Sequence, residues 1–190
     1  MKAFFAVLSL ILDAATLTVL GLALAQRVSP DGAASRLARY VRSSALWLAF
    51  VVALGSSLGS LYLSEIAHFD ISLCPICEYQ RICMFPLAVV LLVGIWRRDD
   101  LVWTYVLPPA LIGAAFAAYH TQLQAFPHQH LFFCQFDSLT NVHQCTVRYV
   151  WEFGFVSIPF MSLSAFVFII VMMLIVRANH RSTEAAGAYD

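Results

Sequence analysis

Five long apolar segments constrain the fold of this chain more than any other feature. They cover residues 3–25, 45–63, 79–96, 101–119 and 153–176. Each has about 18–24 residues, which at ~1.5 Å per residue is enough to cross a hydrocarbon layer of ~30 Å. A lipid layer offers no water to the backbone, so a segment that crosses it must form a helix or part of a closed barrel. Segments of this length predict helices, and hence an all-α polytopic membrane protein.

The composition supports this prediction. The chain is 61% hydrophobic and 12% charged, whereas soluble domains carry about 25% charged residues. Its 11 basic and 11 acidic residues cancel. A neutral chain without a basic patch does not suit nucleic acid, so the lipid bilayer is the expected partner and nucleic acid is excluded.

The basic residues predict the orientation of the chain in the membrane. Alternate connections contain eight of the eleven: Arg27, Arg36, Arg39, Arg42, Arg97, Arg98, Arg177 and Arg181. By the positive-inside rule these connections are cytoplasmic. The N-terminus is then outside and the C-terminus cytoplasmic. Residues 23–25 resemble a signal-peptidase site, but cleavage there would leave an arginine-rich loop outside, so we expect an uncleaved helix.

Four of the five cysteines fall in the two outer connections. Cys74 and Cys77 lie in residues 64–78, and Cys134 and Cys145 lie in residues 120–152. Disulfides form and persist on the extracytoplasmic side. The fifth cysteine, Cys83, lies inside the third apolar segment, where we expect it to pack as a small apolar side chain.

Three interpretations of the two pairs remain open: structural staples, metal ligands and redox centres. A bridge between Cys134 and Cys145 would close a ten-residue loop, which suits a stabilising disulfide. A bridge between Cys74 and Cys77 closes almost no loop, so this pair is better suited to thiol–disulfide exchange.

Metal binding has some support from histidines near the second pair: His120, His128, His130 and His143. Their spacings do not match the paired spacings of zinc sites. The oxidising side also favours disulfides over thiolates, so we predict no metal.

The residues around the first pair favour redox chemistry. Pro75 suits the first position of a helix, which would place Cys77 in the first turn, where the helix dipole favours a thiolate. Arg81, four residues on, would lie on the same face and stabilise it. Glu78 works against the thiolate. The chain has no haem motif or glycine-rich dinucleotide loop, so a quinone dissolved in the bilayer is the economical electron acceptor.

These residues resemble a known family. The stretch from Cys74 to Leu87 reads CPICEYQRICMFPL, which is similar to the signature CxxCWYQRIxMYPL of the disulfide bond formation protein B (DsbB) family in its BdbC-like branch. Residues 119–124 (YHTQLQ) and 151–163 (WEFGFVSIPFMSL) also agree with that branch. The resemblance covers about residues 45–177. Glu78 replaces a tryptophan and Phe85 a tyrosine of the pattern.

The resemblance implies a quinone-dependent protein disulfide oxidoreductase of the bacterial inner membrane. Cys74 and Cys77 would be the quinone-linked pair. Cys134 and Cys145 would be the loop pair that meets a soluble, DsbA-like thioredoxin-fold oxidase. The reduced partner would attack the loop disulfide, the loop thiols would reduce the first pair, and a Cys77 thiolate would pass the electrons to ubiquinone or menaquinone.

The resemblance further implies that Arg81 lies against the quinone head, with His120 as a second neighbour. It implies a four-helix redox domain over 45–177. An extra transmembrane helix and an arginine-rich cytoplasmic loop (1–44) precede this domain, and a cytoplasmic tail (178–190) follows it. In the extra helix Ser9, Asp13 and Thr16 share one face, and we expect hydrogen bonds from this face to the bundle.

Two alternatives remain. A vitamin K epoxide reductase-like quinone oxidoreductase also has a helical bundle and loop cysteines, but there the loop pair precedes the CxxC, the reverse of the order here. A non-catalytic membrane assembly or metal-handling protein would hold metal with free thiols.

Overall fold

The computed structural model describes residues 2–28, 33–66, 74–126, 136–137, 142–143, 145, 148 and 150–187. Its elements in chain order are the helices α1 (Lys2–Val28) and α2 (Ala33–Leu61), the π-helical turn η1 (Tyr62–Ile66), the helices α3 (Pro75–Arg97) and α4 (Trp103–Ala125), the strands β1 (Phe136–Asp137) and β2 (Val142–His143), and the helix α5 (Ile158–Gly187). The two short strands pair antiparallel between α4 and α5. The all-α prediction is confirmed.

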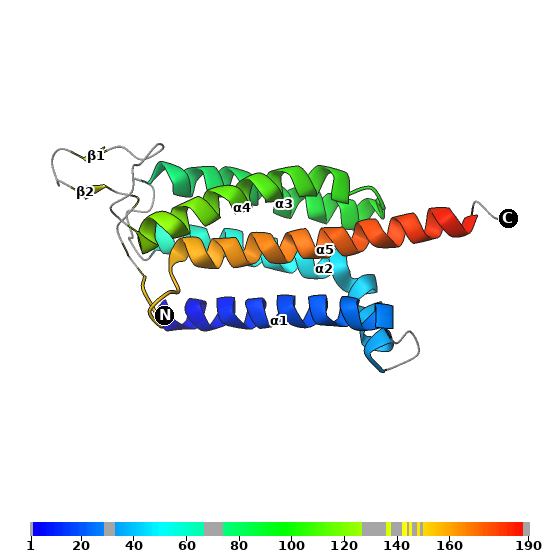
Figure 1. Ribbon diagram of the computed structural model, residues 1–190. Coiled ribbons are helices and arrows are strands. Elements are labelled where there is room, and N and C mark those ends of the chain that lie inside the picture. The colour runs from blue at the N-terminus through cyan, green and yellow to red at the C-terminus, as the bar shows by residue number, and fades with distance from the viewer. Residues whose placement is uncertain are drawn as a thin grey trace.

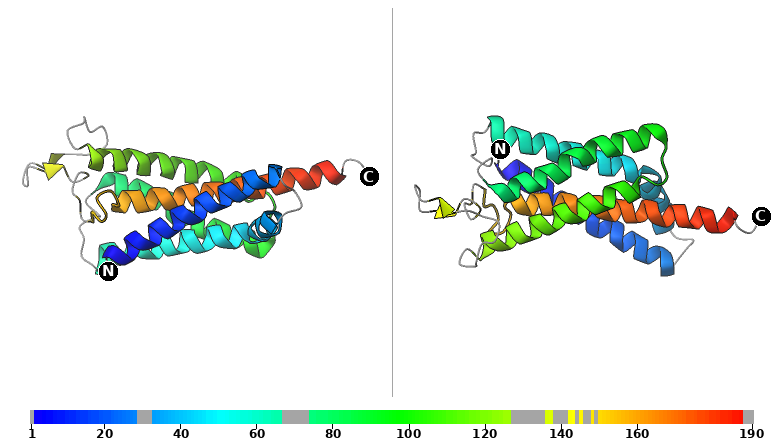
Figure 2. Two further views of the ribbon diagram at one scale, coloured as in Figure 1. Left: turned by 60° about the horizontal axis from the view of Figure 1, so that its bottom comes forward. Right: turned by 90° about the horizontal axis from the view of Figure 1, so that it is seen from above.

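The long helices in the described part of the chain run side by side (Figures 1 and 2). In the ring α2–α3–α4–α5, each helix packs most closely on its two neighbours, and α1 lies outside the ring against α2 and α5. This is the predicted four-helix bundle with one additional helix. The starts of α1, α3 and α5 and the end of α4 gather at one end of the bundle, and the C-terminus lies at the other (Figure 1).

Small residues let the helices of the ring approach closely. Ala45, Ala49 and Ala53 form a fully buried stripe on α2 at a spacing of four. On α4, a Cβ added at Gly113 would lie 2.3 Å from the ring of Phe166 on α5. Because no side chain larger than hydrogen fits there, Phe166 packs directly on the α4 backbone.

Among the described residues, four helices contain segments long and apolar enough to cross a membrane: Ala3–Ala25, Arg39–Ser64, Pro75–Arg97 and Ile158–His180. The fifth predicted crossing, residues 101–119, overlaps α4 from Trp103 onward. At 23 residues α4 is as long as α3 and lies beside it (Figure 1). It does not reach the same hydropathy, since it carries the polar residues Thr104, Tyr105, His120, Thr121, Gln122 and Gln124.

The helices extend beyond the apolar segments. The arginine-rich stretch expected as a loop within residues 26–44 is largely the start of α2, with Arg36, Arg39 and Arg42 on its first turns. The tail expected from residue 178 is helical as far as Gly187. Alanine and arginine are strong helix formers, so these helices continue past the apolar segments that identified them.

The last helix begins later than its apolar segment. Residues 153–157 lie before α5 in a tight turn, closed by backbone hydrogen bonds between Glu152 and Val156. Phe153 and Gly154 have φ angles of 53° and 82°. This left-handed conformation interrupts a helix, so α5 starts at Ile158 rather than at Phe153.

Two residues on the polar face of α1 do not form the predicted hydrogen bonds to the bundle. The Ser9 hydroxyl donates to the Ala6 carbonyl at 2.9 Å, and the Thr16 hydroxyl donates to the Leu12 carbonyl at 2.8 Å. Both side chains are buried, but these hydrogen bonds stay within α1.

Candidate functional site

The CxxC motif lies where α3 begins. Cys74 is the N-cap residue, with an extended backbone (φ −96°, ψ 109°), and Pro75 occupies the first helical position. Proline is favoured there because its fixed φ suits the helix and its missing N–H has no intrahelical partner. Cys77 falls in the first turn, as predicted. Both cysteines are free thiols.

His120, near the end of α4, contacts both sulfurs. Its Nε2 lies 3.8 Å from Cys74 Sγ, and its Nδ1 lies 3.9 Å from Cys77 Sγ. The ring is 2% exposed. The sequence placed His120 at the outer end of the fourth span as a neighbour of the quinone, and the structure places it directly against the dithiol.

Two further hydrogen bonds orient this imidazole. Nε2 lies 3.0 Å from the carbonyl oxygen of Cys145, so it donates there. Nδ1 lies 3.2 Å from the side-chain nitrogen of Gln80 and accepts from it. This pattern fits a neutral imidazole with its proton on Nε2. Nδ1 then has one lone pair, which accepts the hydrogen bond from Gln80. If the Gln80 amide turns away, the same lone pair can accept the proton of the Cys77 thiol, whose sulfur lies 3.9 Å from Nδ1.

The second cysteine loop reaches the same place. Cys145 is fully buried in a cluster with Cys74, Ile76 and Leu123, and it is disulfide-bonded. Cys134, its expected partner, lies outside the described residues. Arg148 follows Cys145, donates from Nε and Nη2 to the Gln124 carbonyl at the end of α4, and stacks over the Trp151 ring. These contacts hold Arg148 against the end of α4 and Trp151.

The environment of Cys74 stabilises its thiolate. A hydrogen bond from the Cys77 thiol is the largest cause, and His120 adds a hydrogen bond and a favourable electrostatic interaction. Together they outweigh burial and lower the pKa of the Cys74 thiol from an ordinary 9.0 to about 4. We expected the thiolate at Cys77 from its place in the helix. In the structure Cys77 is instead the donor that stabilises a thiolate at Cys74.

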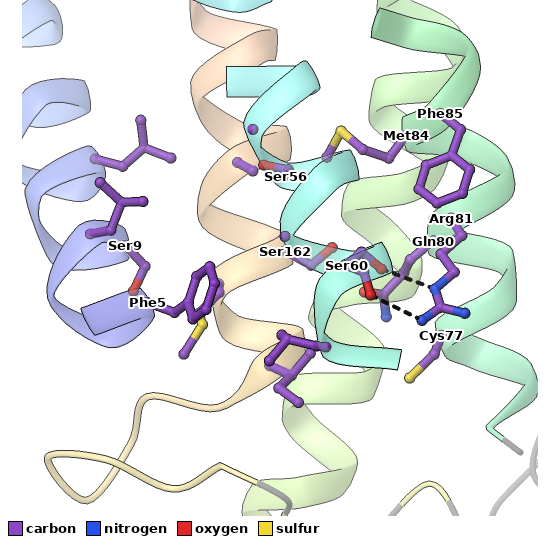
Figure 3. A pocket seen from close by; sticks show the side chains of 18 residues that line it. Phe5, Ser9, Ser56, Ser60, Cys77, Gln80, Arg81, Met84, Phe85 and Ser162 are labelled. Atoms are coloured by element: carbon purple, nitrogen blue, oxygen red, sulfur yellow. Dashed lines mark hydrogen bonds between the residues drawn. The ribbon is translucent and has the colours of Figure 1, made fainter. Parts of the chain in front are cut away.

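Arg81 lies one turn deeper than Cys77. Its Nε donates to the Ser60 hydroxyl of α2 at 2.9 Å, and its Nη2 donates to the Ser60 carbonyl at 3.4 Å (Figure 3). Its Nη1 forms an ion pair of 3.1 Å with Glu78. Glu78, which had no explanation in the sequence, is thus the counter-ion of Arg81.

A cavity of about 200 Å³ opens beside these residues. Cys77, Gln80 and Arg81 line it from α3, Ser56 and Ser60 from α2, and Ser162 from α5 (Figure 3). The remaining lining is mostly apolar and includes residues of α1. His120 does not line this cavity. Cys77 and Gln80 lie between His120 and the cavity, because each contacts His120 and also lines the cavity.

The structure therefore brings Cys74, Cys77, Cys145 and His120 into one cluster, with Arg81 one turn further along α3. Sequence reasoning missed Gln80 and Ser60. Gln80 could have been found, because it lies three residues after Cys77 on one helical face. Nothing near Ser60 in the sequence points to Arg81, which lies 21 residues further along the chain.

The same cluster offers ligands to a soft metal. Sulfur atoms of Cys74 and Cys77 and a ring nitrogen of His120 lie within 4.8 Å of one another, and thiolate and imidazole are ligands that zinc prefers. The side chains of His128, His130 and His143, considered above as ligands, lie outside the described part of the structure.

Comparison with known proteins identifies one family. The sequence model described as "Disulfide bond formation protein DsbB" matches residues 42–176. No solved structure gives a significant match.

Three relatives illustrate the similarity. Disulfide bond formation protein C of Bacillus subtilis is 39% identical over 134 residues, which cover 70% of this chain and 93% of the relative. A probable disulfide formation protein C of Halalkalibacterium halodurans is 39% identical over 127 residues, 67% of this chain and 88% of the relative. A probable disulfide formation protein of Chlamydia pneumoniae is 32% identical over 138 residues, 73% of this chain and 95% of the relative.

Proposed function

Because the chain belongs to the DsbB family of disulfide bond formation proteins, we propose that this multi-pass membrane protein reoxidises a soluble, DsbA-like dithiol oxidase and delivers the electrons to a membrane quinone. The observation that carries the proposal is the position of Cys77. It contacts the cluster of Cys74 and His120 on one side and lines the cavity with Arg81 on the other.

The thiol steps follow from the contacts of Cys74. The partner's thiolate attacks the loop disulfide of Cys134 and Cys145 and forms a mixed disulfide, which releases a loop thiolate. We infer that Cys145 is the released sulfur, because it shares the buried cluster with Cys74. Its attack on oxidised Cys74 breaks the Cys74–Cys77 bond and frees Cys77. The partner's second thiol then resolves its mixed disulfide and leaves as the oxidised product. Re-formation of the loop disulfide expels Cys74, so the first pair ends as a dithiol.

The cavity residues suit a quinone head. Arg81 and Gln80 offer N–H donors, serine hydroxyls offer further donors, and the remaining wall is apolar. A quinone bound there would accept two electrons and two protons from the dithiol, which returns to a disulfide. We propose that Arg81 holds the quinone oxygen and that Cys77 faces the ring. His120 Nδ1, between Cys77 and Gln80, would take up the Cys77 proton.

We propose the orientation that the basic residues predict. The cysteine-bearing end of the bundle, together with the start of α1, would face the extracytoplasmic side of a bacterial inner membrane, and the C-terminus would face the cytoplasm. The redox unit would comprise residues 45–177, with 1–44 and 178–190 as additions at its two ends.

The decisive test compares the unmodified protein with its Cys77→Ser variant. The assay measures quinone reduction with a reduced DsbA-like protein as the electron donor. The variant should abolish turnover, because the Cys74–Cys77 disulfide that the quinone would regenerate can no longer form. Cys83→Ser is the matched control. It removes a free thiol in the same helix, away from the cluster, and should leave the rate unchanged. Turnover retained in Cys77→Ser would refute the proposal, as would stoichiometric metal bound by the thiols of the purified protein.

A further inference from the structure

Helix α1 contributes one wall of the cavity. Phe5, Leu8, Ser9 and Leu12 line it, and their spacing of three and four residues places them on one face of α1. Figure 3 shows Phe5 and Ser9 of this set. The family match begins at residue 42, so this wall lies outside the part of the chain that the family describes.

α1 is fitted closely to α2 at the cavity. A Cβ added at Gly59 of α2 would lie 3.4 Å from the ring of Phe5, so glycine there lets the aromatic ring pack against the α2 backbone. The Phe5 ring also lies 6.2 Å from that of Tyr62, measured between centroids. Ser9 is 5% exposed, and its hydroxyl is bonded within α1. The α1 wall therefore presents an almost entirely apolar surface.

The cavity has two exposed lining residues, one on α1 and one on α2. Leu8 lines it and is also 51% exposed. Gly55 of α2 lines it too and is exposed, and a Cβ added there would meet nothing within 4 Å. The two glycines of the pattern Gly55-x-x-x-Gly59 thus have different roles. Gly59 lets the Phe5 ring pack against α2, and the missing side chain of Gly55 leaves space at the edge of the cavity.

The opposite wall is polar and reactive, with Cys77, Gln80 and Arg81. At about 200 Å³ the cavity is smaller than the ~300–1,000 Å³ clefts that enclose drug-sized ligands, which suits a single ring system and not its tail. We propose that α1 is a structural part of the quinone site: its face from Phe5 to Leu12 packs on the quinone ring, and the ring enters between Leu8 and Gly55. This inference rests on the proposed quinone reduction and assigns a role to the additional helix.

Photolabelling of the full chain in lipid nanodiscs with an azido-substituted quinone tests the inference directly. We expect labelled peptides from α1 within residues 5–12 as well as from α3. Leu8→Trp should reduce the quinone affinity, measured by competition for labelling, by about tenfold or more, the equivalent of ~1.4 kcal/mol. Ile11→Trp is the matched control, because Ile11 is 59% exposed on the same helix and does not line the cavity. Ile11→Trp should change the quinone affinity by less than about twofold, far below the tenfold loss expected for Leu8→Trp.

A second variant, Gly55→Leu, narrows the opening from α2 and should weaken labelling in the same way. Thiol exchange with the reduced partner, measured in one turnover without quinone, should be unchanged in Leu8→Trp, Ile11→Trp and Gly55→Leu. This measurement shows that the three variants are folded. Labelling confined to α3 and α4, or equal affinities of Leu8→Trp and Ile11→Trp, would overturn the role of α1 and leave quinone reduction standing. Absence of labelling together with absence of quinone reduction in the unmodified protein would overturn both proposals.

Discussion

Removal of the Cys77 thiol should raise the pKa of Cys74. The thiol of Cys77 is the largest cause of the low pKa of Cys74, about 4, and burial opposes it. In Cys77→Ala the donor is lost while Cys74 stays buried. A hydrogen bond to a charged group contributes about 1.5–3 kcal/mol, and one pKa unit corresponds to about 1.36 kcal/mol. The pKa of Cys74 should therefore rise by about one to two units.

The measurement is the pH dependence of alkylation of reduced protein, with the modified cysteine identified by mass spectrometry. Thiolate reacts and thiol does not, so the midpoint of the rate reports the pKa of Cys74. Cys77→Ser keeps a hydroxyl donor and should retain most of the lowering. His120→Ala removes the second contributor and should produce a smaller rise than Cys77→Ala. A midpoint near 9 in the unmodified protein, or one unchanged in Cys77→Ala, would refute the assignment of the charge to Cys74.

The same pKa sets the direction of a stability effect. Since the folded pKa of Cys74 is depressed, the thiolate stabilises the reduced folded protein fully above pH 9, the unfolded value. That contribution declines as the pH falls and is lost through pH 4. The reduced protein should thus lose stability on acidification, and the loss should be smaller in Cys77→Ala.

Two further substitutions test the packing and the ion pair. Gly113→Ala would bring a Cβ within 2.3 Å of Phe166 and should cost about 1–3 kcal/mol of stability as an overpacked core, measured by thermal unfolding in detergent. Gly55→Ala, where a Cβ meets nothing within 4 Å, is its control and should be neutral or slightly stabilising. Glu78→Gln should change stability by less than about 1 kcal/mol, because the pair is partly exposed. By freeing one nitrogen of Arg81 it should also lower the KM for quinone, and an increased KM would contradict the proposed contact.

Features encoded over a few residues were predictable from the sequence. The start of α3 at Pro75 and the position of Cys77 in its first turn follow from proline preference and helical spacing. The bundle and the additional helix follow from the lengths of the apolar segments. Where polar and apolar residues mix, in α4 and at the start of α2, hydropathy misjudged the extent of the helices.

Contacts between distant residues were not predictable. His120 lies 46 residues from Cys74, and only the packing of α3 on α4 shows that its ring contacts both sulfurs. The low pKa of Cys74 depends on the same contacts, so reasoning from the helix dipole alone chose Cys77. The approach of α1 to the cavity likewise depends on how α1 packs against α2 and α5.

The spacing of the CxxC accounts for the division of labour between its two sulfurs. Cys74 precedes the first turn of α3 and meets the cysteine loop, whereas Cys77 lies three residues further on, about 4.5 Å along the axis at ~1.5 Å per residue. Gln80 and Arg81 follow at three and four residues and so share the face of Cys77. In the proposed mechanism, a bond between the two sulfurs would therefore connect the surface proposed for thiol exchange to the cavity proposed for the quinone. Each residue added or removed between the two cysteines would shift the second sulfur by about 1.5 Å along the axis and turn it by about 100° around it, so another spacing would misalign the two sulfurs for the specific geometry of a disulfide. We therefore expect insertion of one residue between Cys74 and Cys77 to stop quinone reduction even if both thiols remain reactive.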